Sequence, residues 1–177
     1  METKFTRPLA DVAVTPDGTA IEGYASLFGL PDQGGDIVER GAYAASLKRL
    51  ASAGESVKLL WQHDPAQPIG VWDELREDAR GLYVKGRLLP DVARAREAAV
   101  LIRAGAIDGL SIGYRTVRAT KDDQGRRRLA EIELWEVSLV TFPMLREARL
   151  GAKGADLALL HQMTAAVAAA RTRLMGQ

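Results

Sequence analysis

Short runs of apolar, aromatic and β-branched residues recur between residues 21 and 143, and residues that favour turns separate them. Such runs predict β-strands, because their side chains pack well on a pleated surface. The strands expected from this pattern cover residues 21–28, 57–64, 69–78, 81–89, 109–119 and 128–141. The third and fourth of these form the expected β-hairpin, and Pro143 ends the last strand.

Two segments carry helical periodicity instead. In residues 41–54, apolar side chains recur about one helical turn apart, and Gly54 is an expected C-terminal cap. In residues 91–105, an apolar stripe follows Asp91, the expected N-cap, and Gly105 is expected just after the helix end. The Ala-rich residues 151–177 predict a third helix after a glycine-containing hinge.

These elements predict a mainly β, α+β fold. Strands that are short and regularly spaced favour a closed antiparallel barrel of six or seven strands over a doubly wound sheet. The chain has 177 residues, which suits one domain over residues 1–150 with a helical tail over residues 151–177.

Composition narrows the possible functions. The net charge is +1, so bulk charge gives no case for a nucleic-acid or membrane-surface partner. The chain has no cysteine, which excludes disulfides, thiolate metal sites and a cysteine nucleophile, and fits a reducing compartment. No apolar stretch approaches the length of a membrane span or resembles a signal peptide, so a cytoplasmic location is expected.

The two histidines are the first candidates for chemistry. His63 lies at the expected end of a strand, before Asp64 and Pro65, where a side chain can reach a site. Its simpler interpretation is an imidazole satisfied by local hydrogen bonds. His161 lies in the Ala-rich tail and is expected at a surface.

Ser111 lies between two glycines in the segment G-L-S-I-G-Y, residues 109–114. Strand alternation places Ser111, Gly113 and Arg115 on one face of the strand. This face is nearly bare, which would allow substrate to approach closely and a backbone N–H to point at an oxyanion. By itself, a serine between glycines is also consistent with an ordinary strand residue, and the surroundings are not those of a nucleophile elbow.

Glu136 is the third candidate. Strict alternation places it on the same face as Ile132, Leu134 and Ser138, where an ionised carboxylate needs a partner. An imidazole N–H would serve, as in a Ser-His-acid triad. An arginine on the neighbouring strand, Arg115 or Arg118, would serve equally well.

Five motifs, in order, resemble the caudovirus (HK97-type) prohead protease family. They are G-Y-A-S-L-F-G, G-D-I-V-E-R-G-A-Y, W-Q-H-D with a following P-I-G, G-L-S-I-G-Y, and E-V-S-L-V-T-F-P. The resemblance covers about residues 21–150. After the last motif the family commonly continues with Ala-Asn-Pro, whereas this chain continues Met144-Leu145-Arg146.

The resemblance implies a fold related to the herpesvirus maturational serine proteases and a serine endopeptidase activity. It implies His63, Ser111 and Glu136 as the catalytic residues. Its implied substrates are the scaffolding region of the major capsid protein and the enzyme itself, inside the assembling procapsid of a phage, prophage or gene transfer agent in the host cytoplasm. Self-association is also expected.

No metal or cofactor is expected, since two histidines without cysteine argue against a catalytic zinc site. Two alternatives stay open at this point. One is an internal scaffold or assembly protein of the same fold with an inactive site, and the other is an unrelated β-barrel binding module.

Overall fold

The computed structural model describes Thr15 and residues 18–150. Its single sheet has seven strands, in the order β1–β5–β4–β3–β7, with β6 and β2 both paired to β7. The strands are β1 (Ala20–Leu27), β2 (Ile37–Val38), β3 (Lys58–Trp61), β4 (Asp64–Glu77), β5 (Gly81–Leu88), β6 (Gly109–Lys121) and β7 (Arg127–Val140). The two helices of this part of the chain are α1 (Ala44–Ala53) and α2 (Ala93–Arg103).

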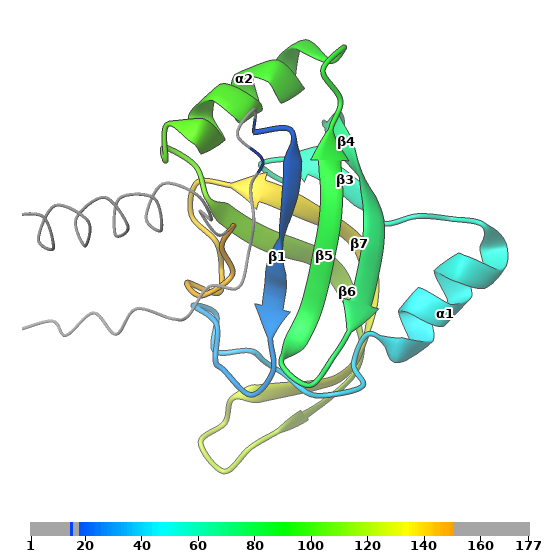
Figure 1. Cartoon of the computed structure of the whole chain (residues 1–177). Helices are drawn as coiled ribbons and strands as arrows, with labels where there is room; N and C mark the ends of the chain where they lie inside the picture. The colour runs from blue at the N-terminus through cyan, green and yellow to red at the C-terminus, as the bar shows by residue number, and fades with distance from the viewer. Residues whose placement is uncertain (1–14, 16–17, 151–177) are drawn as a thin grey trace, which may run out of the picture.

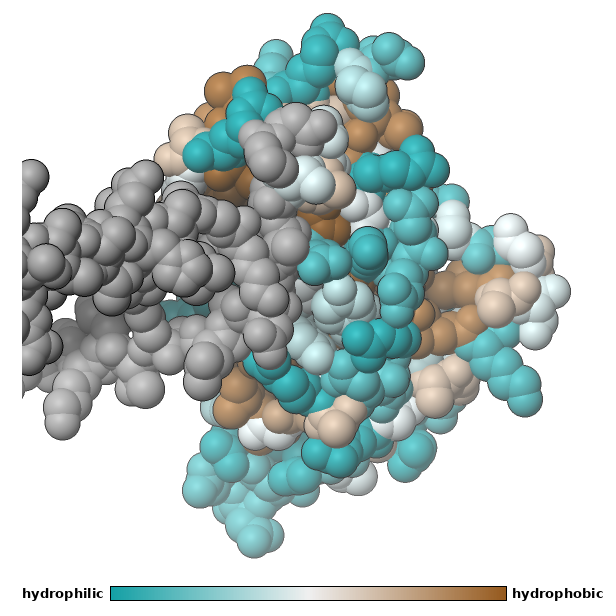
Figure 2. Space-filling model, viewed as in Figure 1, coloured by the Kyte–Doolittle hydropathy of each residue, from teal (hydrophilic) through white to brown (hydrophobic). Residues whose placement is uncertain are grey.

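The sheet is strongly curled, so that it forms two layers. In Figure 1, β1, β5 and β4 lie side by side in front, and β6 and β7 cross behind them. Helix α2 covers one end of the curl and contacts β4 and β5, while α1 contacts β7 and β4. Figure 2 shows the outer surface of the front strands as largely hydrophilic, with hydrophobic groups beside the two helices.

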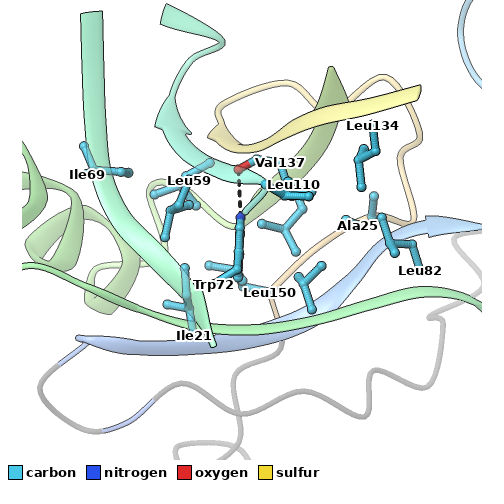
Figure 3. Packing of buried hydrophobic residues seen from close by; sticks show 14 of the residues in the cluster. Ile21, Ala25, Leu59, Ile69, Trp72, Leu82, Leu110, Leu134, Val137 and Leu150 are labelled. Atoms are coloured by element: carbon cyan, nitrogen blue, oxygen red, sulfur yellow. Dashed lines mark hydrogen bonds between the residues drawn. The ribbon is translucent and has the colours of Figure 1, made fainter. Parts of the chain in front are cut away.

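The hydrophobic core lies between the two layers. Strand β5 shows why: Leu82, Val84 and Leu88 are buried, whereas Lys85 and Arg87, between them, are exposed. Trp72 of β4 crosses this core, and its Nε1–H donates to the carbonyl of Val137 in β7 at 3.3 Å (Figure 3). This bond joins the two layers near the C-terminal end of β7.

The prediction of a closed barrel is wrong. No ladder joins β1 to β6 in the described part of the chain, and the sheet is an open half-barrel. Residues 148–150, which we call the closing segment, lie in the gap: Leu150 forms a bridge with Gly23 of β1, and Arg149 forms one with Gly109 of β6. The long strands could be predicted from local patterns. Whether β1 pairs with β6, however, depends on the curl of the whole sheet.

Both predicted helices and the predicted hairpin are confirmed, with one correction. Asp91 is not the N-cap of α2; Val92 occupies that position, in an extended conformation and without a side-chain cap. A turn in which the Val92 N–H donates to the Leu89 carbonyl delays the start of the helix by one residue. Gly54 and Gly105 follow the helix ends with positive φ, as predicted. His161 and the predicted tail helix lie outside the described residues.

Candidate active site

His63 lies in the two-residue turn between β3 and β4, where Trp61 pairs with Asp64. Gln62 and His63 have φ angles of 52° and 61°, the positive pair of a type I′ hairpin turn. A residue other than glycine is strained there, by about 1–2 kcal/mol. Contacts to β7 hold the turn in place: the Gln62 N–H donates to the Leu139 carbonyl at 3.0 Å, and the His63 N–H donates to Ser138 Oγ at 3.2 Å.

The imidazole of His63 contacts Glu136. Nδ1 of His63 lies 2.6 Å from Oε1 of Glu136, and because a carboxylate can only accept, Nδ1 carries the proton. The other oxygen, Oε2, accepts a hydrogen bond from the hydroxyl of Ser138 at 2.5 Å. The Glu136 side chain is 12% exposed and that of His63 is 42% exposed, so the acid is covered and the imidazole faces the entrance of the site.

The arginine alternative for Glu136 is not what the structure shows. Arg115 instead binds Glu133, with Nε donating to Oε2 at 2.8 Å, and Arg118 lies 3.8 Å from Glu131. Arg49 of α1 also contacts Glu133, and the hydrogen bonds from Arg115 and Arg49 lower the pKa of that carboxyl.

Strict alternation misplaced Glu136 relative to its neighbours. The ladder between β6 and β7 shifts register between Gly113, which opposes Glu136, and Tyr114, which opposes Leu134. The bulge at Trp135 therefore turns Leu134 and Val137 toward the same core, and Glu136 shares the opposite face with Ser138. This correction leaves Glu136 on the face of Ser111.

Ser111 lies directly across the ladder from Ser138. Opposed residues of an antiparallel pair share a face, with Cβ atoms about 5 Å apart, so the Ser111 side chain is a near neighbour of the His63–Glu136 pair. Ser111 is 3% exposed. Among the described residues, its hydroxyl makes no hydrogen bond to His63. The structure thus brings His63 and Glu136 into contact and places Ser111 beside them.

Gly113 has a different role from the one that the sequence suggested. A Cβ atom at this position would lie 2.0 Å from Oε1 of Glu136. The space left by the missing side chain is therefore filled by the acid, whereas the sequence suggested that it would admit substrate. Gly113 is the reason that the carboxylate can lie flat over β6 and reach His63.

Ser138 is a residue of the site that the sequence reasoning did not identify. It is fully buried, and its hydroxyl contacts both His63 and Glu136. The available signal was a polar residue two positions after Glu136 in an otherwise apolar strand end, V-S-L-V.

The surroundings contain groups with other roles. Asp64, next to His63, accepts from the Ala66 amide and the Gln67 side chain, and these bonds lower its pKa. Burial and Asp36 raise the pKa of Tyr114, on the core side of β6, to about 12. Within the described part of the chain, no three His, Cys, Asp or Glu residues are grouped to hold a metal ion, and no helix is long and apolar enough to cross a membrane.

Comparisons with known proteins agree on one class. The family model described as caudovirus prohead serine protease matches residues 8–162. The prohead protease of Enterobacteria phage HK97 is 34% identical over 150 residues, covering 80% of this chain and 64% of that protein, so the chain spans less than two thirds of its relative's length.

Two solved structures share the fold. The capsid assembly protease of bacteriophage T4 has a TM-score of 0.52 at 18% identity, over 68% of this chain and 82% of that one. The KSHV protease, solved with a hexapeptide phosphonate inhibitor, has a TM-score of 0.50 at 16% identity, over 74% of this chain and 63% of that one. The expected likeness to a herpesvirus protease is thus confirmed at the level of the fold.

Proposed function

The chain belongs to the family of caudovirus prohead serine proteases, and we propose that it is a serine endopeptidase with Ser111 as nucleophile, His63 as base and Glu136 as the acid that orients His63. The observation that carries this proposal is the 2.6 Å contact between His63 Nδ1 and Glu136 Oε1, on the face of the sheet that bears Ser111. In this arrangement a buried acid fixes the tautomer of a half-exposed imidazole beside a serine.

The geometry suggests how the proton moves. With Nδ1–H donated to Glu136, the lone pair of Nε2 is free to take the proton of Ser111 Oγ as the oxygen attacks a peptide carbonyl. Nε2 then returns the proton to the leaving amine, while Glu136 stabilises the imidazolium. Catalytic hydrogen bonds often form only when substrate binds. In this proposal, the hydrogen bond between Ser111 and His63 is therefore absent from the free enzyme and forms in the complex with substrate.

Backbone amides are the proposed donors to the oxyanion. Arg115 is on the face of Ser111, but its guanidinium is engaged by Glu133 at 2.5 Å and 2.8 Å. Arg115 would have to leave Glu133 before it could bind an oxyanion, whereas a backbone N–H would not have to break an ion pair. Two backbone N–H groups suffice in other acyl-transfer sites. No step of this mechanism requires a metal or a cofactor.

The proposed substrates are the scaffolding region of the major capsid protein and the protease chain itself, which would be cut inside the assembling procapsid. The family name supports action in the prohead, and one relative of known structure is named as a capsid assembly protease. Neither nucleic acid nor membrane has a part in this proposal, and self-association of the protease remains an additional expectation.

Co-expression with the cognate major capsid protein tests the proposal. The wild type and the control Ser52→Ala, at an exposed helix position, should yield capsid protein with one discrete N-terminal truncation in its intact mass. Ser111→Ala and His63→Ala should yield full-length protein, because each substitution costs about 10⁴-fold or more in kcat, and Glu136→Ala should cost less.

Full-length capsid protein with the wild type, in assembled particles that contain folded protease, would contradict the proposal. That result would favour an internal scaffold of the same fold with an inactive site.

A further inference from the structure

Ser138 is a buried hydroxyl in a strand end that is otherwise apolar. Its exposed fraction is 0%, and its chain neighbours Val137 and Leu139 belong to the core. A hydroxyl removed from water costs free energy unless its hydrogen bonds are replaced. The hydrogen-bond partners of Ser138 therefore indicate its role.

Both partners of Ser138 belong to the candidate triad. The hydroxyl has one proton, which it donates to Oε2 of Glu136 at 2.5 Å. It accepts the backbone N–H of His63 at 3.2 Å. With the contact between His63 Nδ1 and Glu136 Oε1, these bonds form a closed ring that joins the backbone and the imidazole of His63 to one carboxylate.

We propose that Ser138 is a positioning residue that holds Glu136 and His63 in register for proton transfer. The inference rests on the proposed function. A carboxylate bound through Oε1 alone can turn about its last C–C bond, whereas a second bond through Oε2 fixes its plane. The bond to the His63 amide holds a turn whose positive φ angles are unfavourable for Gln62 and His63.

The neighbours of Ser138 shield it from solvent. Across the ladders it opposes Leu60 of β3 and Ser111 of β6, which are 6% and 3% exposed. An alanine at position 138 would leave the His63 amide and one oxygen of Glu136 without their partner in a closed space. A threonine would keep the hydroxyl and add one methyl group.

The rate of covalent labelling of Ser111 by a fluorophosphonate tests the positioning role without a known peptide substrate. Ser138→Ala should label about 10²-fold more slowly than wild type, the cost expected for a displaced catalytic group. Ser138→Thr should recover part of the rate. The matched control is Ser46→Ala, which removes another buried hydroxyl that accepts an amide of β7, that of Leu134 at 3.0 Å, without touching the triad. It should label at the wild-type rate per folded molecule.

A double-mutant cycle identifies the route of the effect. Because one of its two bonds goes to Glu136, Ser138→Ala should cost clearly less in a Glu136→Ala background than in the wild type, and the loss that remains belongs to the bond from the His63 amide. Equal losses in both backgrounds, or wild-type labelling of Ser138→Ala, would overturn the inference.

A spectroscopic measurement separates this inference from the proposed function. In a Ser111→Ala background, the downfield proton resonance of His63 Nδ1–H should be present, and it should broaden or vanish when Ser138→Ala is added. An unchanged resonance would overturn the positioning role. Absence of labelling in the wild type with the resonance behaving as expected would instead overturn the protease assignment and leave the hydrogen-bonded ring in place.

Discussion

At Gly113, the absence of a side chain admits the carboxylate of Glu136 to the face of the sheet that carries Ser111. The site as a whole is built from small residues around one acid: Ser111 and Gly113 on β6, and Ser138 on β7. Small side chains allow the acid to lie against the sheet and still reach the histidine in the neighbouring turn. The position of Glu136 therefore depends both on the absence of a side chain at Gly113 and on the hydrogen bonds that His63 and Ser138 donate.

Gly113→Ala should abolish the proposed activity while leaving a folded protein. The new Cβ would overlap Oε1 of Glu136, so the carboxylate must leave its contact with His63. The expected loss in fluorophosphonate labelling is on the order of 10²–10⁴-fold, up to that of removing the triad acid. The control is Gly54→Ala at the end of α1, where a Cβ would meet nothing within 4 Å, and its labelling per folded molecule should match that of the wild type. Equal labelling of the two variants would refute the role assigned to Gly113.

The candidate residues could be identified from motifs, but their geometry could not. His63, Ser111 and Glu136 each stand in a recognisable segment, and alternation correctly grouped Ser111 with Gly113. Alternation failed at Trp135, because a bulge adds one residue to β7 and the sequence carries no mark of it. Ser138 was missed because its role depends on the turn at His63, 75 residues earlier in the chain.

At the scale of elements, local rules accounted for both helices and the hairpin of β4 and β5. They placed His63 at the end of a strand over residues 57–64, whereas that strand ends at Trp61 and Asp64 already begins β4. These rules succeeded for the two helices, because apolar periodicity and a glycine after each helix are local features of the sequence. They failed at the start of α2, where the Leu89–Val92 turn takes over from the expected Asp91 cap. The arrangement of strands also explains the site, because β3 and the C-terminal end of β7 are joined by a parallel ladder that pairs Leu60 with Ser138.

Gly54→Ala should lower the free energy of unfolding by about 1 kcal/mol, since φ at this C-terminal cap is 66° and favours glycine. A Cβ there would meet nothing within 4 Å, so the cost is conformational only. Urea unfolding in a Ser111→Ala background, which prevents self-digestion, measures it. Ser52→Ala, in the same helix, should be neutral or slightly stabilising. A Gly54→Ala variant as stable as its parent would show that the cap conformation is not what ends α1.

At the scale of the whole molecule, the open side of the half-barrel is partly filled by the closing segment. Ala148 and Leu150 are 0% and 6% exposed. The Leu110 N–H donates to the Ala148 carbonyl at 2.7 Å, next to Ser111, so the closing segment also holds the strand that carries Ser111. The order of strands was not predictable from local patterns, because pairing between β3 and β7 joins residues far apart in the chain.

Leu150→Ala should destabilise the fold by about 2–4 kcal/mol, as expected for a buried leucine whose cavity cannot be refilled. Arg149→Ala, the adjacent control, removes an exposed ion pair with Asp108 and should cost much less. Urea unfolding of both variants in the Ser111→Ala background compares them. Equal stabilities would mean that residues 148–150 do not complete the core.

The central claim, that Ser111 is a nucleophile activated by the His63–Glu136 pair, is tested most directly by mapping the adduct of a fluorophosphonate by peptide mass spectrometry. The account predicts one modified residue, Ser111, in the wild type, no adduct in Ser111→Ala, and labelling slowed by about 10⁴-fold or more in His63→Ala. An adduct on another serine, or labelling of Ser111 that is indifferent to His63, would contradict it.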